Sequence, residues 1–198
     1  PTEDPLAGFL PPNVTSPEGQ GSVLFTVNQK PNLPTGTEIR NQASIVFDYN
    51  PPILTPELLH TIDDDPPRTS VNPLPEKSPP SFTLFLSLDD GPQGSGVVET
   101  DVYASSDGGP FARWKSTSER SVRFDGEPGH RYEFYAVSKD CAGNFEAPRE
   151  ESEAETLTVM SHSLRVVVVS GNGRVVIDPE MESYLAGMAV TLTALPEN

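Results

Sequence analysis

Prolines and glycines interrupt this chain so often that its regular elements must be short. The 198 residues include 22 prolines and 15 glycines, and both residue types end helices and mark turns. Between these breaks no window keeps the 3.6-residue apolar period of an amphipathic helix, whereas several alternate apolar and polar residues as strands do. We therefore expect an all-β chain with no helix longer than about two turns.

The charge balance restricts the classes of partner. The formal net charge is −16 with only 13 basic residues, so little is available to neutralise phosphates, and nucleic acid is not an expected ligand. The same charge disfavours anionic membrane surfaces, and no apolar stretch has the length for membrane insertion. An acidic surface of this kind suits an extracellular protein or one that binds cations.

The first 62 residues contain two or three strand patterns. Residues 1–20 are expected to be irregular, and residues 21–30 alternate apolar with polar side chains. Residues 41–50 and 51–62 indicate a second and a third strand, the latter limited by its prolines to an edge. Because so few strands bury too little to be stable alone, we expect residues 1–62 to be the C-terminal part of a β-sandwich.

Residues 68–159 have the pattern of a complete sandwich. They hold about seven strand-like runs with turn signals every 8–12 residues, which is the spacing of an Ig-like fold. Asp107-Gly108-Gly109 stands between two alternating runs and predicts a hairpin turn. The glutamate-rich residues 146–155 are expected to be solvated.

An acidic joint precedes this module and a small β-module follows it. The joint, residues 63–67, has the sequence DDDPP. In residues 160–198, two strands are expected around Gly171-Asn172-Gly173 and a third follows. This last module looks like the beginning of a larger one, because three strands without a covering layer bury little.

Several motifs resemble those of bacterial modular proteins. The motifs SDGGPFARW, EPGHRYEFYAVSKD and DCAGNFEAP make residues 68–159 similar to a bacterial fibronectin type III-like domain. That resemblance implies a Pro128-Gly129 turn followed by a tyrosine-corner-like bond from Tyr132. The stretch LRVVVVSGNGRVVIDPE looks like the start of an internalin-type B repeat, and LPTGTEIRNQASIVFDYN looks like the end of an Ig-like repeat of large secreted proteins.

Together these resemblances imply a piece of a modular, extracellular bacterial protein. The expected architecture is a tandem array of Ig-like and fibronectin type III-like sandwiches joined by a linker rich in Pro and Asp. No catalytic signature is found. The three histidines, His60, His130 and His162, are not expected to converge, and Cys141 is expected to be an exposed free thiol. We therefore expect a protein that is not an enzyme.

The acidic loops suggest a cation site. In a fibronectin-like sandwich, the loop after the second strand, the loop after the sixth strand and the incoming linker lie at one pole. The oxygen-bearing side chains of these three segments are those of Asp63, Asp64, Asp65, Asp89, Asp90, Asp140 and Asn144. Calcium takes about 6–8 such oxygens. The competing interpretation is ordinary turn chemistry, since Asp, Asn and Gly are common turn residues.

The expected function is that of a spacer, stalk or adhesion segment in a large secreted or cell-surface protein. Its partners would be neighbouring modules of the same polypeptide and surface glycans or proteins, with calcium stiffening the joint. One alternative is an accessory region of a secreted enzyme that degrades polysaccharide or protein. Another is a carbohydrate-binding module, which would expose a row of aromatics, and Tyr103, Phe111 and Trp114 are the candidates.

Overall fold

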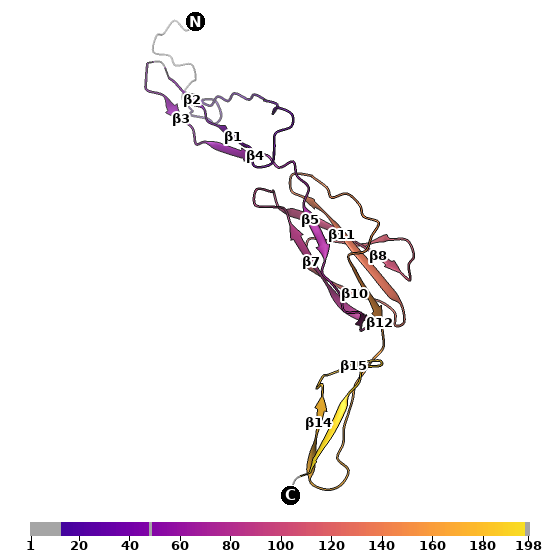
Figure 1. Cartoon of the computed structure of the whole chain (residues 1–198). Coiled ribbons are helices and arrows are strands. Elements are labelled where there is room, and N and C mark those ends of the chain that lie inside the picture. Colours follow the sequence, from indigo (N-terminus) through magenta and orange to yellow (C-terminus); the bar gives the residue numbers. More distant parts are fainter. Residues whose placement is uncertain (1–12, 48, 197–198) are drawn as a thin grey trace. The chain divides into compact units, whose positions relative to one another are not determined.

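Strands are the only regular elements in the described part of the chain (Figure 1). The computed structural model describes residues 13–47 and 49–196, which confirms the all-β class. The chain divides into two compact units, residues 1–33 and 34–198. Within the described residues no helix is long and apolar enough to cross a membrane. Residues 13–20 are irregular as expected, whereas residues 1–12 lie outside the described residues.

Two sheets form a sandwich in the middle of the chain. The smaller sheet has the order β10-β7-β5 and the larger one the order β6-β12-β11-β8-β9. The strands of the smaller sheet are β5 (Arg68–Val71), β7 (Ser81–Asp89) and β10 (Ser121–Asp125). Those of the larger sheet are β6 (Lys77–Ser78), β8 (Val97–Ser106), β9 (Ala112–Thr117), β11 (Arg131–Asp140) and β12 (Ala154–Thr158). All these pairs are antiparallel except β6 with β12.

Alternating side chains from both sheets fill the space between them. The buried cluster consists of Val71, Leu84, Leu86, Val102, Val122, Phe124, Phe134, Ala136 and Ala154. Phe124 is central, because the rings of Phe82, Tyr132 and Phe134 all lie within 5.3 Å of its ring centroid. Truncating a buried phenylalanine of this kind to alanine typically costs about 3–5 kcal/mol.

The predicted hairpin turn is confirmed. Asp107 and Gly108 have φ angles of 53° and 73°, the left-handed values that a tight two-residue hairpin turn needs. The Gly109 N–H closes the turn by donating to the Ser106 carbonyl at 3.0 Å. Aspartate and glycine are among the residues that adopt these angles most readily, which is why this turn was visible in the sequence.

The strand pattern before the acidic joint forms only in part. β1 (Glu38–Asn41) pairs with β4 (Leu58–Thr61), and β2 (Ser44–Ile45) pairs with β3 (Ile53–Leu54), so each predicted strand is interrupted. Position 48 lies outside the described residues. The strand predicted for residues 21–30 is wrong: these residues are irregular, and Leu24 is 96% exposed. An alternating segment becomes a strand only when a neighbour bonds its N–H and C=O groups, and no described segment does so here.

The C-terminal module pairs its strands differently from the predicted hairpin. Residues 163–169 form no strand, so the strand predicted before the Gly171–Gly173 turn is wrong. Instead, β14 (Gly173–Asp178) pairs with β16 (Thr191–Pro196), and β13 (Ser161–His162) pairs with β15 (Tyr184–Leu185). The β16 backbone lies so close to Gly173 that a Cβ atom there would be 2.7 Å from the Leu195 carbonyl oxygen. Glycine at position 173 therefore allows β16 to approach β14 closely. Residues 197 and 198, at the end of the last predicted strand, are outside the described residues.

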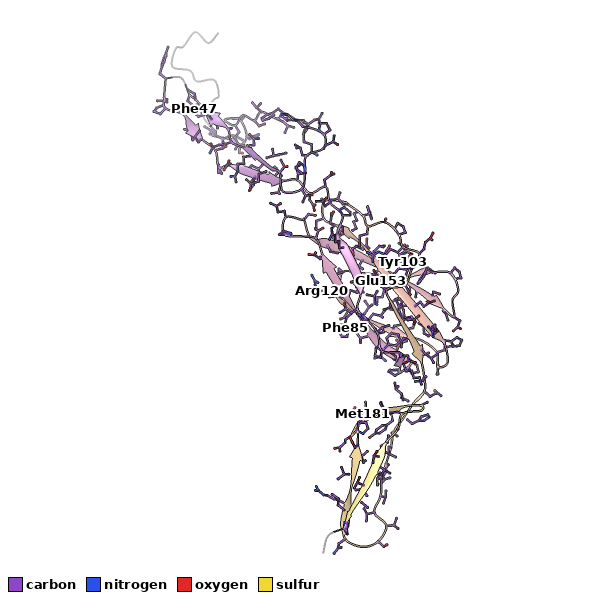
Figure 2. The ribbon with its side chains drawn as sticks, in the orientation of Figure 1. Phe47, Phe85, Tyr103, Arg120, Glu153 and Met181 are labelled. Carbon is purple, nitrogen blue, oxygen red and sulfur yellow. The ribbon has the colours of Figure 1, made fainter. Side chains whose placement is uncertain are left out.

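The glutamate-rich segment is not simply solvated. Glu146 accepts backbone N–H groups from Thr69 and Ser138, each at 2.8 Å. Glu153, labelled in Figure 2, accepts those of Val71 at 2.9 Å and Ala136 at 3.1 Å. We call residues 145–153 the acidic strap. The prediction of a solvated segment holds for the exposed Glu150 and Glu151, among others. It is wrong for Glu146 and Glu153, which bridge two strands.

Strand pairing explains these two exceptions. β12 pairs only with Arg131–Phe134 of β11, and β5 lies near the rest of β11 without pairing with it. Thr69 and Val71 on β5, and Ala136 and Ser138 on β11, have N–H groups that no strand accepts, and the two carboxylates accept all four. Backbone donors at a buried edge must find acceptors, and here side chains provide them.

The tyrosine-corner-like bond of Tyr132, which the resemblance implies, is present at the start of β11. The Tyr132 hydroxyl oxygen accepts the Glu127 N–H at 2.9 Å. A Cβ atom at Gly126 would lie 2.6 Å from the Tyr132 ring and 2.8 Å from that of Phe124. Glycine at this position therefore lets the turn close over the aromatic core.

We predict that Tyr132→Phe lowers the free energy of unfolding by about 1 kcal/mol, the usual net value of such a hydrogen bond. Urea denaturation of the full chain measures this. Tyr103→Phe is the matched control, because the Tyr103 ring stacks on Tyr135 at 4.6 Å and keeps that contact without its hydroxyl. Equal stability of the two variants would contradict a stabilising role for the Tyr132 bond.

Candidate cation site at the acidic joint

Thr35 holds the acidic joint from its N-terminal side. Its hydroxyl oxygen accepts the N–H groups of Asp64 at 2.8 Å and Asp65 at 3.1 Å. The same hydroxyl lies 3.4 Å from Oδ1 of Asp63, to which it donates. The sequence does not predict the role of Thr35, because nothing in a turn-rich segment indicates that its threonine bonds to residues about thirty positions away.

The loop between β7 and β8 supplies the second group of contacts. Ser95 donates its N–H to Oδ2 of Asp63 at 2.7 Å. Within the loop, Oδ2 of Asp90 accepts the Gly96 N–H at 2.5 Å. A Cβ atom at Gly94 would lie only 1.8 Å from the Asp90 carbonyl oxygen, so the loop folds tightly around Asp90 only because residue 94 is glycine.

The turn after β11 supplies the third group. Asp140 is fully buried, and its Oδ1 accepts the N–H groups of Gly143 at 2.6 Å and Asn144 at 2.8 Å. Its Oδ2 accepts the Asn144 side-chain amide at 2.7 Å. The same amide nitrogen lies 3.1 Å from the Asp63 carbonyl oxygen and 3.3 Å from that of Asp65. Asn144 therefore joins the turn directly to the acidic joint.

Three carboxylates from these three segments converge. Asp63, Asp90 and Asp140 each offer a carboxylate oxygen, and these oxygens lie within 4.8 Å of one another. Within the described part of the chain, no Lys, Arg or His forms an ion pair with any of the three. Like charges at this separation repel, and partial burial increases the repulsion.

The pKa values of two of these groups reflect their surroundings. Burial raises the pKa of Asp90 above its ordinary value, and the neighbouring carboxylates of Asp63, Asp140 and Asp89 raise it further. Burial also opposes the ionisation of Asp63, but hydrogen bonds from Ser95, Asp65 and Thr35 outweigh it and lower the pKa of Asp63. Of these two carboxylates, Asp90 is therefore the one that gains more from a nearby positive charge.

The residues predicted from the sequence divide into two groups. Asp63, Asp90 and Asp140 come together, with Asn144 bonded to Asp140 beside them. The exposed side chains of Asp64, Asp65 and Asp89 are not part of this cluster. Asp65 contributes its carbonyl to the Asn144 contact, and Asp89 caps its own turn by accepting the Gly91 N–H.

This donor set suits a hard divalent cation. Calcium and magnesium prefer carboxylate and carbonyl oxygens, and the cluster places three carboxylates close to the carbonyl groups of Asp63 and Asp65. A cation bound there would offset the mutual repulsion of the three carboxylates. It would also connect the linker with both loops.

The other chemical candidates lie apart from this cluster. His130 pairs with Asp107 at 2.7 Å. The hydrogen bond to Asp107 raises the pKa of His130. The pKa of Asp107 is lowered mainly by the hydrogen bond from the Arg131 N–H and next by the one with His130. His60 is on β4 and His162 on β13, so the histidines do not converge. Cys141 has an exposed free thiol and donates its N–H to the Gly96 carbonyl at 2.9 Å.

The three aromatic candidates for sugar binding do not form one row. Trp114 packs against the buried Phe124, with ring centroids 5.1 Å apart. Tyr103 and Phe111 instead pack on Tyr135, at 4.6 Å and 4.9 Å. Tyr135 alternates with the core residues Phe134 and Ala136, so these contacts lie on the opposite face of the sheet.

Comparison with known proteins gives a match for the first part of the chain only. Residues 8–61 match a family model described as a domain of unknown function, DUF7619. The match ends just before the acidic joint. No curated protein and no solved structure matches the chain.

We predict that Asp90→Asn raises the melting temperature by a few degrees in the presence of chelator. A carboxyl whose pKa is raised by folding makes the protein less stable as pH rises through that pKa, because the folded state then loses its tighter-bound proton. The amide removes this charge and can still accept the Gly96 N–H. The excess stability over wild type should therefore grow from acidic to neutral pH.

Asp64→Asn is the matched control, since its exposed carboxylate is outside the cluster. Scanning calorimetry with chelator from acidic to neutral pH gives the comparison. If Asp90→Asn were less stable than both wild type and the control at neutral pH, the carboxylates would not be in repulsion.

Proposed function

We propose that this chain is a non-catalytic spacer or adhesion segment of a large secreted or cell-surface bacterial protein, with a calcium-dependent joint. Its partners would be neighbouring modules of the same polypeptide and surface glycans or proteins. The single observation that carries the proposal is the convergence of Asp63, Asp90 and Asp140 within 4.8 Å. These residues come from the linker and from two loops of the sandwich, so a shared cation would bridge all three segments.

The hydrogen bonds around the cluster support a role in positioning modules. The linker already bonds to Thr35 on one side and to Ser95 and Asn144 on the other. Pro66 and Pro67 follow directly, and proline reduces the conformational freedom of a linker. A cation would add bonds that no flexible linker provides. The segment before the joint and the sandwich after it would then hold one orientation.

This role accounts for the carboxylate of Asp63 and for the stiff Pro66-Pro67 pair that follows it, whereas Asp64 and Asp65 lie outside the cluster. Without a cation, three neighbouring carboxylates repel and favour separation of the linker from the loops. With one, the same carboxylates become ligands. Calcium concentration outside cells is high enough to occupy weak sites, with dissociation constants of about 10⁻⁴–10⁻³ M in extracellular modules.

Calcium should raise the melting temperature of the full chain, and chelator should reverse the effect. Calcium at 100 times its dissociation constant would stabilise the folded state by about 2.7 kcal/mol. Isothermal calorimetry and thermal unfolding measure binding and stabilisation. Asp90→Asn and Asp63→Asn should abolish or strongly weaken both responses, while Asp64→Asn should keep them.

Two results would contradict this proposal. One is a wild-type chain that gives no heat with millimolar calcium and melts identically with calcium and with chelator. The other is a calcium response that survives in Asp90→Asn but is lost in Asp64→Asn, which would place the site away from the cluster. Small-angle scattering with and without calcium then tests whether the bound joint holds one orientation.

A further inference from the structure

We propose that Glu146 and Glu153 of the acidic strap form a mechanical lock that keeps the sandwich folded under tension. The inference rests on the proposed spacer function, because a spacer is pulled at both ends. It does not depend on a bound cation. Its basis is the pair of carboxylates that bridge β5 and β11, two strands of different sheets that are not paired with each other.

Tension would enter and leave the sandwich through different sheets. The chain enters at β5, which is the edge strand of the three-stranded sheet, and leaves from β12 in the five-stranded sheet (Figure 1). Because β5 begins at one pole and β12 ends at the other, a pull on the two ends acts to slide β5 along the larger sheet. The contacts that resist this movement are the ones that bear the load.

β5 is joined to its own sheet by a short ladder. Only four residue pairs, Arg68↔Asp89 to Val71↔Leu86, join it to β7. On its other edge, Thr69 and Val71 donate N–H groups to Glu146 and Glu153. A buried hydroxyl contact between Thr69 and Ser138, at 2.6 Å, adds a direct link to β11. Because these bonds run across the strand, a pull along β5 loads them together instead of one after another.

The strap is well suited to carry this load. It is fixed to β11 by two backbone bonds, from Glu146 N–H to the Ser138 carbonyl at 3.0 Å and from Glu153 N–H to the Phe134 carbonyl at 2.8 Å. Arg149 pairs with both glutamates and offsets part of their charge. Hydrogen bonds to ionised acceptors are stronger than neutral ones.

The two glutamates bridge the strands in different ways, which provides an internal control. Glu146 uses one oxygen for Thr69 and the other for Ser138. Glutamine has only one oxygen, so Glu146→Gln leaves one N–H facing an amide NH₂ group. Glu153 uses a single oxygen, Oε2, for both Val71 and Ala136. Glu153→Gln can keep both of these bonds and loses mainly its charge pair with Arg149.

Force spectroscopy on the full chain, with handles at its two ends and chelator present, tests the lock. The unfolding step of the sandwich is identified from its contour length, and forced unfolding reports the unfolding rate. In wild type the charge-assisted bond stabilises the folded state and is already broken in the transition state for unfolding. Glu146→Gln lacks this bond, so it should unfold at least about tenfold faster than wild type at the same force. Glu153→Gln should be affected less. Glu150→Gln, with its exposed side chain on the same strap, should match wild type.

Equal unfolding rates for Glu146→Gln and Glu150→Gln would overturn the proposal. If Glu146→Gln does not fold, the comparison moves to Glu153→Ala and Glu153→Gln. The alanine variant removes the acceptor of Val71 and Ala136, so it should unfold about tenfold faster than the glutamine variant, and equal rates would again overturn the lock. Loss of calcium binding in Asp90→Asn leaves these rates unchanged, so the two proposals fail separately.

Discussion

The buried carboxylate of Asp140 is the interaction on which the rest of this structure depends. By accepting two backbone N–H groups and the Asn144 amide, it fixes the turn that ends β11. That turn places Asn144 against the linker carbonyls and places Glu146, two residues later, against β5. One aspartate therefore sets both the geometry of the acidic joint and the start of the strap. Burying a carboxylate costs free energy unless hydrogen bonds compensate it. The turn must therefore keep the conformation that supplies these bonds.

The sequence predicted the structure best where the conformation depends on neighbouring residues alone. The strands of the sandwich follow from alternation, and the turn at Asp107-Gly108 follows from the left-handed angles that these residues accept. Residues 21–30 and 163–169 have the same alternating or apolar character and form no strand, because strand formation also requires a partner that local sequence does not reveal. Three of the predicted acidic ligands meet because topology brings their loops together. Asp64 and Asp65 stay outside because neighbouring residues in a linker point in different directions.

Carboxylates serve two different purposes in this chain. In the strap, Glu146 and Glu153 share Arg149 and accept backbone donors, so part of their charge is offset by the protein itself. At the joint, Asp63, Asp90 and Asp140 face one another, and in the described part of the chain no basic side chain is paired with them. The difference lies in where the positive charge comes from. The strap has a positive charge within the fold, whereas at the joint the proposed site would take it from solution.

The exposed thiol of Cys141 makes the joint accessible to a reporter group. It is the only cysteine in the chain, and it directly follows Asp140. Its backbone is held by the Gly96 carbonyl while its side chain is exposed. A fluorophore or spin label attached there would be unique in position and anchored on a fixed turn. Such a label would turn local electrostatic changes at the acidic cluster into an optical or magnetic signal, without any engineered cysteine.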